Sequence, residues 1–330
     1  MQFLILIISA LNFFALPPDS SGLVSSSFNL RDEVISVQNF KSHEKINFVF
    51  NKEIYQLGCD TMPNVKFWRN IMKLHKDSGL FNTPLNRNIL SKTHVKNWEK
   101  LDLTQKSCFK DSLRNSYCLS DSDRILLTNG KNFFYDFEKA ASNFDRGIND
   151  FIANDVDPWY AQAILMIESP NKLQKSNVGA YGPFQLMKDV ARLFGLKVNK
   201  HIDERADFDR SAYAASSLIK KICIPKTKQI LDSLGVKNYK ENELWFRLLV
   251  MHSYHAGAGN VKKALFSFKP QEGGMPLIYT LWRTETKQFK SASQNYSQLV
   301  LAAMLEINEK FGLAPRQLTI PKIDKQAALR

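Results

Sequence analysis

Apolar residues recur at every third or fourth position along much of the chain, which is the period of a helix with one buried face. Between residues 133 and 152 this spacing is carried by Phe, Ala and Ile, and further runs cover residues 158–169, 210–222, 241–257 and 296–312. Alternation typical of strands is scarce. The pattern therefore predicts a mainly α fold whose strongest helical signal begins after residue 130.

Four residues indicate where these helices begin and end. Asp157 suits an N-cap because its carboxylate accepts from a free backbone N–H, and Pro158 fits the first helical position. Gly257 and Gly312 follow apolar runs, where a helix commonly stops at a residue in the left-handed conformation.

The first 22 residues have the pattern of an export signal. An apolar run from Leu4 to Leu16 is closed by two prolines, and it is shorter than the ~20 residues of a membrane-spanning helix. The positively charged leader of most signals is missing, since Arg31 is the first basic residue. We expect export to the periplasm or cell envelope, with an uncleaved N-terminal membrane anchor as the alternative.

Residues 23–130 give a weaker signal. One amphipathic helix is expected around residues 65–74, with Gly79 as a candidate end, and other short runs also favour helix. No motif in this region points to a particular chemistry. We expect it to be helical and of unknown role.

The formal net charge is +13 and the pI about 9.4. The excess of Lys and Arg is spread along the chain rather than gathered in a tail, and no nucleic-acid-binding motif accompanies it. Nucleic acid is therefore not expected as a partner. A cell-wall glycan with carboxylate-bearing peptides fits this charge, and so does an ordinary solvated surface.

The four cysteines are Cys59, Cys108, Cys118 and Cys223. In an exported protein an even number permits disulfides, and a bridge between Cys108 and Cys118 would close a small loop. Buried free thiols are the equal alternative. No group of Cys and His has the spacing of a zinc site.

Glu168 closes the apolar run that begins at Pro158. On a helix it shares a face with Ala161, Ile164 and Leu165, and a carboxyl group held against such a face loses solvation. Its pKa would rise, which suits a general acid near neutral pH. The plainer alternative is a Glu at a helix end that points to water.

Two Gly-rich segments follow, "GAYGPFQLM" from residue 179 and "SYHAGAGNV" from residue 253. Glycines let a backbone approach a ligand closely, Gln185 offers a donor and an acceptor, and Tyr254 offers a ring with a polar tip. Each feature is weak when taken alone.

In order and spacing, "ES", "GAYGPFQLM", "SYHAGAGNV" and "NYSQLV" resemble the catalytic domain of soluble lytic transglycosylases, relatives of goose-type lysozyme. The resemblance covers roughly residues 145–312 and implies a mainly α, lysozyme-like catalytic domain. We therefore expect a signal peptide over residues 1–22, an N-terminal region over 23–130, the catalytic domain over 131–315 and a C-terminal tail over 316–330.

The resemblance also assigns roles to individual residues. Glu168 matches the catalytic acid/base, and Ser169 and Gln185 match cleft residues that contact the sugar or orient the Glu. Tyr254 matches the Tyr of the third motif, and Tyr296 matches the late cleft Tyr.

Several positions depart from the family pattern. His255 stands where the family has Asn, Pro183 and Phe184 replace Leu-Met, and Lys188 and Asp189 replace a Pro-x-Thr segment. The link between the Glu and the first Gly-rich segment is about one residue short. We keep His255 as a candidate substrate-binding residue.

The implied reaction cleaves peptidoglycan after N-acetylmuramic acid, with one Glu as acid and base and a 1,6-anhydro product, and needs no metal or organic cofactor. One alternative is a hydrolysing muramidase, for which Asp189, Asp203 and Asp207 are candidate second carboxylates. Another is a glycan-binding or scaffolding module that lost turnover. A cell-envelope protein could bind through residues 23–130, and the sequence leaves the oligomeric state open.

The signal-like segment should be removed from the mature protein. Mass spectrometry of exported material should find an N-terminus between about Pro17 and Ser27. An intact Met1 in membrane-extracted protein would instead favour the anchor.

Overall fold

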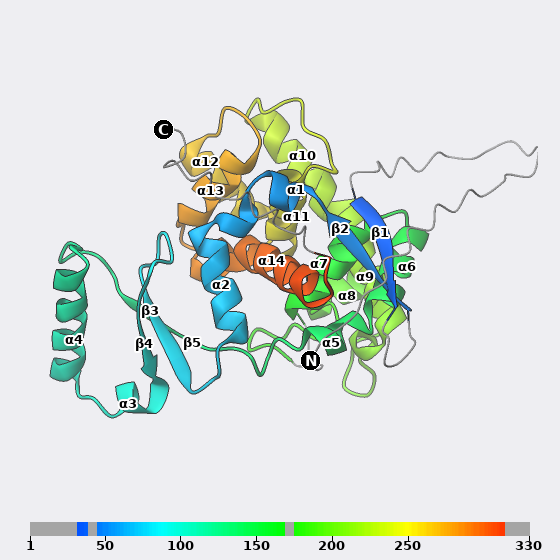
Figure 1. The fold of residues 1–330 in the computed structure, drawn as a ribbon. Helices are drawn as coiled ribbons and strands as arrows, with labels where there is room; N and C mark the ends of the chain where they lie inside the picture. The colour runs from blue at the N-terminus through cyan, green and yellow to red at the C-terminus, as the bar shows by residue number, and fades with distance from the viewer. Residues whose placement is uncertain (1–31, 39–44, 169–174, 314–330) are drawn as a thin grey trace, which may run out of the picture.

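The computed structural model describes residues 32–38, 45–168 and 175–313 (Figure 1). The elements up to residue 141 are β1 (Asp32–Gln38), β2 (Lys45–Asn51), α1 (Glu53–Gln56), a 3-10 turn (Cys59–Thr61), α2 (Pro63–Lys73), β3 (Ser78–Asn82), β4 (Ile89–His94), α3 (Val95–Glu99), α4 (Leu103–Ser116), β5 (Leu126–Asn129) and α5 (Phe137–Ala141). The later elements are α6 (Phe144–Ala153), α7 (Pro158–Glu168), α8 (Lys188–Leu193), a 3-10 turn (Glu204–Ala206), α9 (Phe208–Leu218), a π-helical segment (Ile219–Cys223), α10 (Ile224–Ser233), α11 (Leu244–Ala256), α12 (Ala258–Phe268), α13 (Met275–Arg283) and α14 (Ser291–Lys310).

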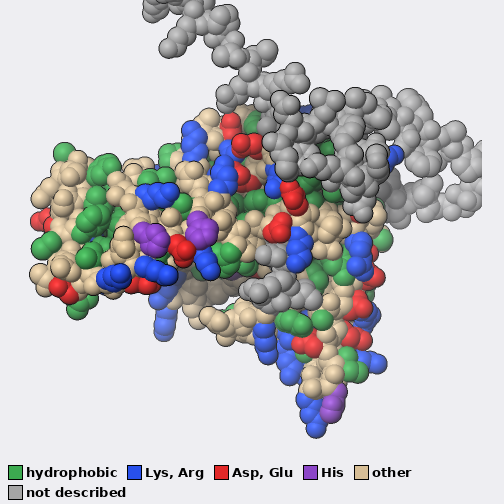
Figure 2. Space-filling view, turned by 60° about the horizontal axis from the view of Figure 1, so that its bottom comes forward, with side chains coloured by type: hydrophobic (Ala, Val, Ile, Leu, Met, Phe, Trp, Pro, Cys, Tyr) green, Lys and Arg blue, Asp and Glu red, His purple; other side chains and the backbone are tan. Residues whose placement is uncertain are grey.

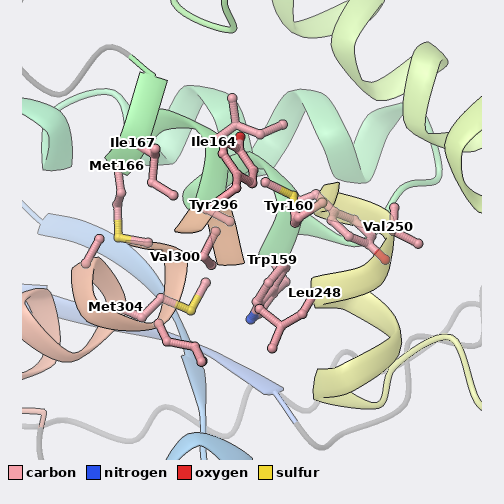
Figure 3. Close-up of a cluster of buried hydrophobic side chains, with 14 of the residues drawn as sticks. Trp159, Tyr160, Ile164, Met166, Ile167, Leu248, Val250, Tyr296, Val300 and Met304 are labelled. Carbon is pink, nitrogen blue, oxygen red and sulfur yellow. The ribbon is translucent and has the colours of Figure 1, made fainter. Parts of the chain in front are cut away.

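Helix α7 lies at the centre of the fold. Its residues from Pro158 to Ile167 are all buried, and α5, α6, α14 and β2 pack against it. Figure 3 shows Trp159, Tyr160 and Ile164 of α7 among side chains of α11 and α14. A helix with no polar face must be surrounded by protein, and the other elements are arranged to do this.

The mainly α fold is confirmed, and the predicted helix ends hold. Pro158 begins α7, with Asp157 accepting a hydrogen bond from the backbone N–H of Trp159 at 2.9 Å. Gly257 ends α11 at a φ of 80°, and Gly312 follows the end of α14 at a φ of 68°.

The helical stretch over residues 133–152 divides into α5 and α6. The division falls at Ser142 and Asn143, and α5 is capped separately by Asp136, whose carboxylate accepts from the N–H of Lys139. Most of the apolar side chains of this stretch are buried, whereas Phe133 is 58% exposed.

The amphipathic helix around residues 65–74 is confirmed as α2, but the predicted end at Gly79 is wrong. The helix stops at Lys73, and Gly79 lies in β3, where a Cβ atom would come within 2.7 Å of the Leu127 side chain. Gly79 therefore marks close packing of β3 against β5 and not a helix end, and a larger residue there would displace the Leu127 side chain.

The N-terminal region was expected to be helical and is instead mixed. Strands β1 and β2 form an antiparallel pair, and β4, β3 and β5 form an antiparallel sheet in that order. Residues 78–129, which we call the sheet lobe, stand out beside the helical body in Figure 1. The lobe has a small apolar cluster of its own, made by Phe81, Leu90, Leu113 and Ile125.

The main hydrophobic core extends across residue 130, where the sequence predicts a domain boundary. That boundary stays a prediction. Val49 of β2 and Trp68 of α2 belong to the same buried cluster as α7. The Gln162 side chain of α7 also pairs with β2: its Oε1 accepts from the N–H of Val49 at 2.8 Å and its Nε2 donates to the Val49 carbonyl at 2.9 Å. The side-chain amide thus makes with Val49 the two hydrogen bonds that a residue of a neighbouring strand would make.

All four cysteines are free thiols, so Cys108 and Cys118 do not form the bridge considered above; both are exposed, whereas Cys59 and Cys223 are buried.

Among the described residues no helix is both long and apolar enough to cross a membrane. The expected segments over residues 1–22 and 316–330 lie outside the described residues. On the face in Figure 2, Lys and Arg alternate with Asp and Glu and do not gather in one basic patch.

Replacing Gln162 by Leu should destabilise the protein by about 2–6 kcal/mol. The change leaves the buried N–H and carbonyl of Val49 without partners, and each unsatisfied group costs about 1–3 kcal/mol. Urea denaturation measures the difference. The control is Gln229→Leu on the exposed side of α10, which should change the free energy of unfolding by less than about 0.5 kcal/mol. Equal effects of the two variants would contradict the pairing role of Gln162.

Candidate active site

Glu168 is the last residue of α7, where the apolar helix reaches the surface of the core, and it is partly buried. Tyr296 of α14, which is 2% exposed, donates a hydrogen bond from its hydroxyl to Oε1 of Glu168 at 2.7 Å. These residues are 128 positions apart in sequence. The contact therefore depends on the packing of α14 against α7, part of which is visible in Figure 3.

Two opposing effects set the proton affinity of Glu168. Burial raises the pKa of its carboxyl group, and the hydrogen bond from Tyr296 lowers this pKa in part because it stabilises the ionised form; the balance is a pKa of about 7. Burial also raises the pKa of Tyr296 well above its usual value, so the phenol keeps its proton and remains a donor. Glu168 is thus a carboxyl group that can both give and take a proton near pH 7.

His255 lies at the end of α11 and contacts the same tyrosine. Its ring is stacked on that of Tyr296, with centroids 4.1 Å apart and planes inclined by 18°. The residue is exposed, but one face of its ring is covered by Tyr296, and desolvation lowers the pKa of the imidazole. The neutral imidazole, with one donor and one acceptor, therefore contacts Tyr296, which in turn donates to Glu168.

The first Gly-rich segment forms a tight turn in which Tyr181 and Leu186 pair through both backbone hydrogen bonds. Gly182 has a φ of 89°, and a Cβ atom there would come within 1.8 Å of the carbonyl oxygen of Arg205. A glycine is therefore needed at position 182 for close packing inside the protein. Gln185 also has a positive φ, 46°, and its Nε2 donates to the carbonyl of Gly182 at 3.0 Å.

Tyr254 connects this turn to α11. Its hydroxyl donates to the carbonyl of Phe184 at 2.6 Å. Phe184, one of the departures from the family pattern, is fully buried and packs against Phe151 and Phe208. The departure is thus accommodated in the core, and the turn keeps its anchor to Tyr254.

The structure brings Glu168, His255 and Tyr296 into one chain of contacts; Gln185 lies in the Gly-rich turn, and Tyr254 lies on α11 and donates to that turn. Ser169 lies outside the described residues. The roles of these residues toward a substrate stay predictions.

Two further residues belong to the site and were missed by the sequence reasoning. Arg205 is 3% exposed and donates to the carbonyls of Gly179 and Leu186, which fixes the Gly-rich turn. Tyr135 is also buried, and the charge of Glu168 helps to raise the pKa of its phenol, after the larger effect of burial. Tyr135 belongs to an aromatic run that looked like core, and nothing near Arg205 in the sequence indicated its long-range partners.

Two of the three Asp residues considered as second carboxylates are engaged with other groups. Asp203 accepts from the guanidinium of Arg205, and Asp207 caps α9. The Asp189 side chain is 97% exposed. Within the described residues, no group of three or more His, Cys, Asp or Glu side chains is arranged to hold a metal ion.

A comparison with protein-family models matches residues 152–273 to the model "Transglycosylase SLT domain". The chain contains a transglycosylase SLT domain. The SLT domain includes Glu168, Gln185, Tyr254 and His255, whereas Tyr296 lies beyond the matched residues. No match is found among curated proteins.

The SLT domain supports a glycan-cleaving function of the lytic transglycosylase type, with peptidoglycan strands as the substrate class. It also agrees with the mainly helical, lysozyme-like architecture around α7.

Replacing Glu168 by Gln should stabilise the protein at pH 8 by about 1–3 kcal/mol and have little effect at pH 4. The folded state raises the pKa of this carboxyl from 4.5 to about 7, so the buried carboxylate destabilises the fold. That cost is absent below about pH 4.5 and complete above about pH 7. Gln imitates the protonated form at every pH.

Urea denaturation at both pH values measures the difference. The control is Glu99→Gln at an exposed position of α3, which should show no such pH dependence. A Glu168→Gln variant that is equally stable relative to the parent at pH 4 and pH 8 would contradict the raised pKa.

Proposed function

We propose that the protein is an exported peptidoglycan lytic transglycosylase in which Glu168 is the single acid/base. It cleaves the bond between N-acetylmuramic acid and N-acetylglucosamine and leaves a 1,6-anhydro end on the muramic acid. The observation that carries the proposal is the position of Glu168: it ends a buried helix, has a pKa of about 7, and receives a hydrogen bond from Tyr296.

In the first step, protonated Glu168 gives its proton to the bridging glycosidic oxygen, and the bond to the muramic acid carbon breaks. Burial supplies the proton donor, because it keeps a large share of Glu168 protonated near neutral pH. The 2-acetamido carbonyl of the substrate stabilises the oxocarbenium-like centre, as the family resemblance implies. Tyr296 then assists, since its hydrogen bond favours the carboxylate that this step creates.

In the second step, ionised Glu168 takes the proton of the sugar's own 6-hydroxyl, whose oxygen bonds to the anomeric carbon and closes the anhydro ring. The nucleophile is part of the same sugar, so its effective concentration is high. The contacts of Asp203 and Asp207 support this route over a water-using one, because Asp203 is bound to Arg205 and Asp207 caps α9.

A hydrolysing muramidase is the second candidate, and His255 is the observation that favours it. Its neutral ring lies on Tyr296 and offers a hydrogen-bond acceptor near Glu168, where a water molecule could be oriented. A binding module without turnover is less well supported, since it has no need of a carboxyl with a pKa near 7.

Digested peptidoglycan should give fragments that end in 1,6-anhydro-N-acetylmuramic acid, each lighter by one water than the hydrolytic fragment. Mass spectrometry beside a muramidase digest distinguishes the two. The Glu168→Gln variant should release fragments at least about 10²-fold more slowly, because it removes the proton in both steps. Glu99→Gln is the matched control and should retain the parent rate.

A digest in which all fragments end in reducing N-acetylmuramic acid would show that the protein is a muramidase. Strand binding without released fragments would support the binding module.

A further inference from the structure

Arg87, in the loop between β3 and β4, carries two separate energetic costs. Its backbone has a φ of 55°, in the left-handed region that a side chain other than Gly or Asn rarely adopts. Arg87 is 4% exposed, and among the described residues it forms no ion pair. Burying a cation without a carboxylate is unfavourable, and this burial lowers the pKa of Arg87 to about 10.

The guanidinium instead joins three parts of the chain. Nη1 donates to Oδ1 of Asn82 in β3, and Nη2 donates to Oδ1 of Asn295 in α14, each at 2.9 Å. The same group lies over the rings of Phe67 and Trp68 in α2, 5.5 and 5.3 Å from their centroids. A planar fork that is always charged is suited to such a junction.

The hydrogen bond from Arg87 reaches α14 at Asn295, next to Tyr296, the residue that donates to Glu168. Gln298, one turn further, is held by the same region, because its Oε1 accepts from Nε1 of Trp68 at 3.1 Å and from Nδ2 of Asn64 at 3.2 Å. Residues three apart share one face of a helix. Contacts of Asn295 and Gln298 therefore fix the rotation of α14 about its axis.

The other side of α14 is fixed as well. The hydroxyl of Ser297 is 2.8 Å from Nε2 of His252 and accepts from Nε1 of Trp282 at 2.7 Å. Tyr296 is thus one of four consecutive residues whose side chains all have defined partners. With side chains a helix is about 10–12 Å wide, so a rotation of about 10° would move the tyrosine hydroxyl by ~1 Å. A displacement of that size is enough to cost about 10²-fold in rate at a reacting centre.

We propose that Arg87 is a positioning residue for the Tyr296–Glu168 pair, which it holds in geometry by fixing α14 through Asn295. Arg87 and Asn295 both lie outside the SLT domain match of residues 152–273. The N-terminal region thereby takes part in the candidate site without touching the substrate. For its effect on turnover this inference rests on the proposed function; its effect on the proton affinity of Glu168 does not.

The test is the pKa of Glu168, measured by carbon NMR of the carboxyl groups in the full chain. Tyr296→Phe removes the hydrogen bond that lowers this pKa, so the pKa should rise. Arg87→Lys keeps the positive charge but loses the fork, and should raise the pKa in the same direction by a smaller amount, about 0.5 unit. In the Tyr296→Phe background, Arg87→Lys should add no further shift, because Arg87 acts through Tyr296.

Turnover gives the second readout. Glu168 must be protonated to act as the acid, so activity falls as the pH rises through its pKa, and Arg87→Lys should move this alkaline limb to higher pH. Turnover should fall about 10-fold, with a smaller change in KM. Asn295→Ala removes only the acceptor on α14 and should reproduce both effects if Arg87→Lys does not fold.

The matched control is Arg69→Gln. Arg69 binds Glu306 and Glu309 at the far end of α14, and Lys73 still pairs with Glu306 when Arg69 is replaced. This variant should lower the Tm but leave the pKa of Glu168 unchanged. If Arg87→Lys and Asn295→Ala also lower only the Tm, Arg87 contributes to the stability of the fold alone and the proposal is wrong. A chain that cleaves no glycan would overturn the proposed function and leave the NMR result to decide this inference.

Discussion

The complete burial of α7 is the constraint on which the rest of the structure depends. A helix without a polar face has to be covered on every side, and α5, α6, α14 and β2 supply that cover from both ends of the chain. Even its one buried amide, Gln162, is used to pair with an edge strand. The carboxyl of Glu168 ends this helix, so the same packing that builds the core also desolvates the candidate acid.

The sequence predicted what depends on local spacing. The periods of three and four residues gave the helices, Asp157 and Gly257 gave two of their ends, and the apolar face beneath Glu168 indicated its raised pKa. The strands of the sheet lobe were missed because they are short and lack alternation. In β3, four of five residues are buried, so no polar face marks it as a strand.

The parts of the site that could not be predicted share one property: their roles come from partners far away in sequence. Arg205 looks like one charge among many, yet it holds the carbonyls of Gly179 and Leu186. Tyr135 sits in a run of aromatic residues whose spacing indicates only a core. Tyr296 was found through family resemblance, and its contact with Glu168 required the structure. Spacing along a chain cannot report such contacts.

The proton affinity of Glu168 is a balance between two terms that come from different parts of the chain. Burial by the core raises it, and one hydrogen bond from α14 lowers it. The first term changes little with small movements, because many groups contribute to it. The second depends on one donor at 2.7 Å, and hydrogen bonds weaken steeply with distance and angle. The geometry of α14 near Tyr296 is therefore the sensitive variable of the site, and the N-terminal region contacts this part of the helix through Asn64, Trp68 and Arg87. A chain reduced to the matched residues 152–273 would contain Glu168 but lack both Tyr296 and the residues that orient it. The candidate site is consequently larger than the SLT domain that contains its carboxylate.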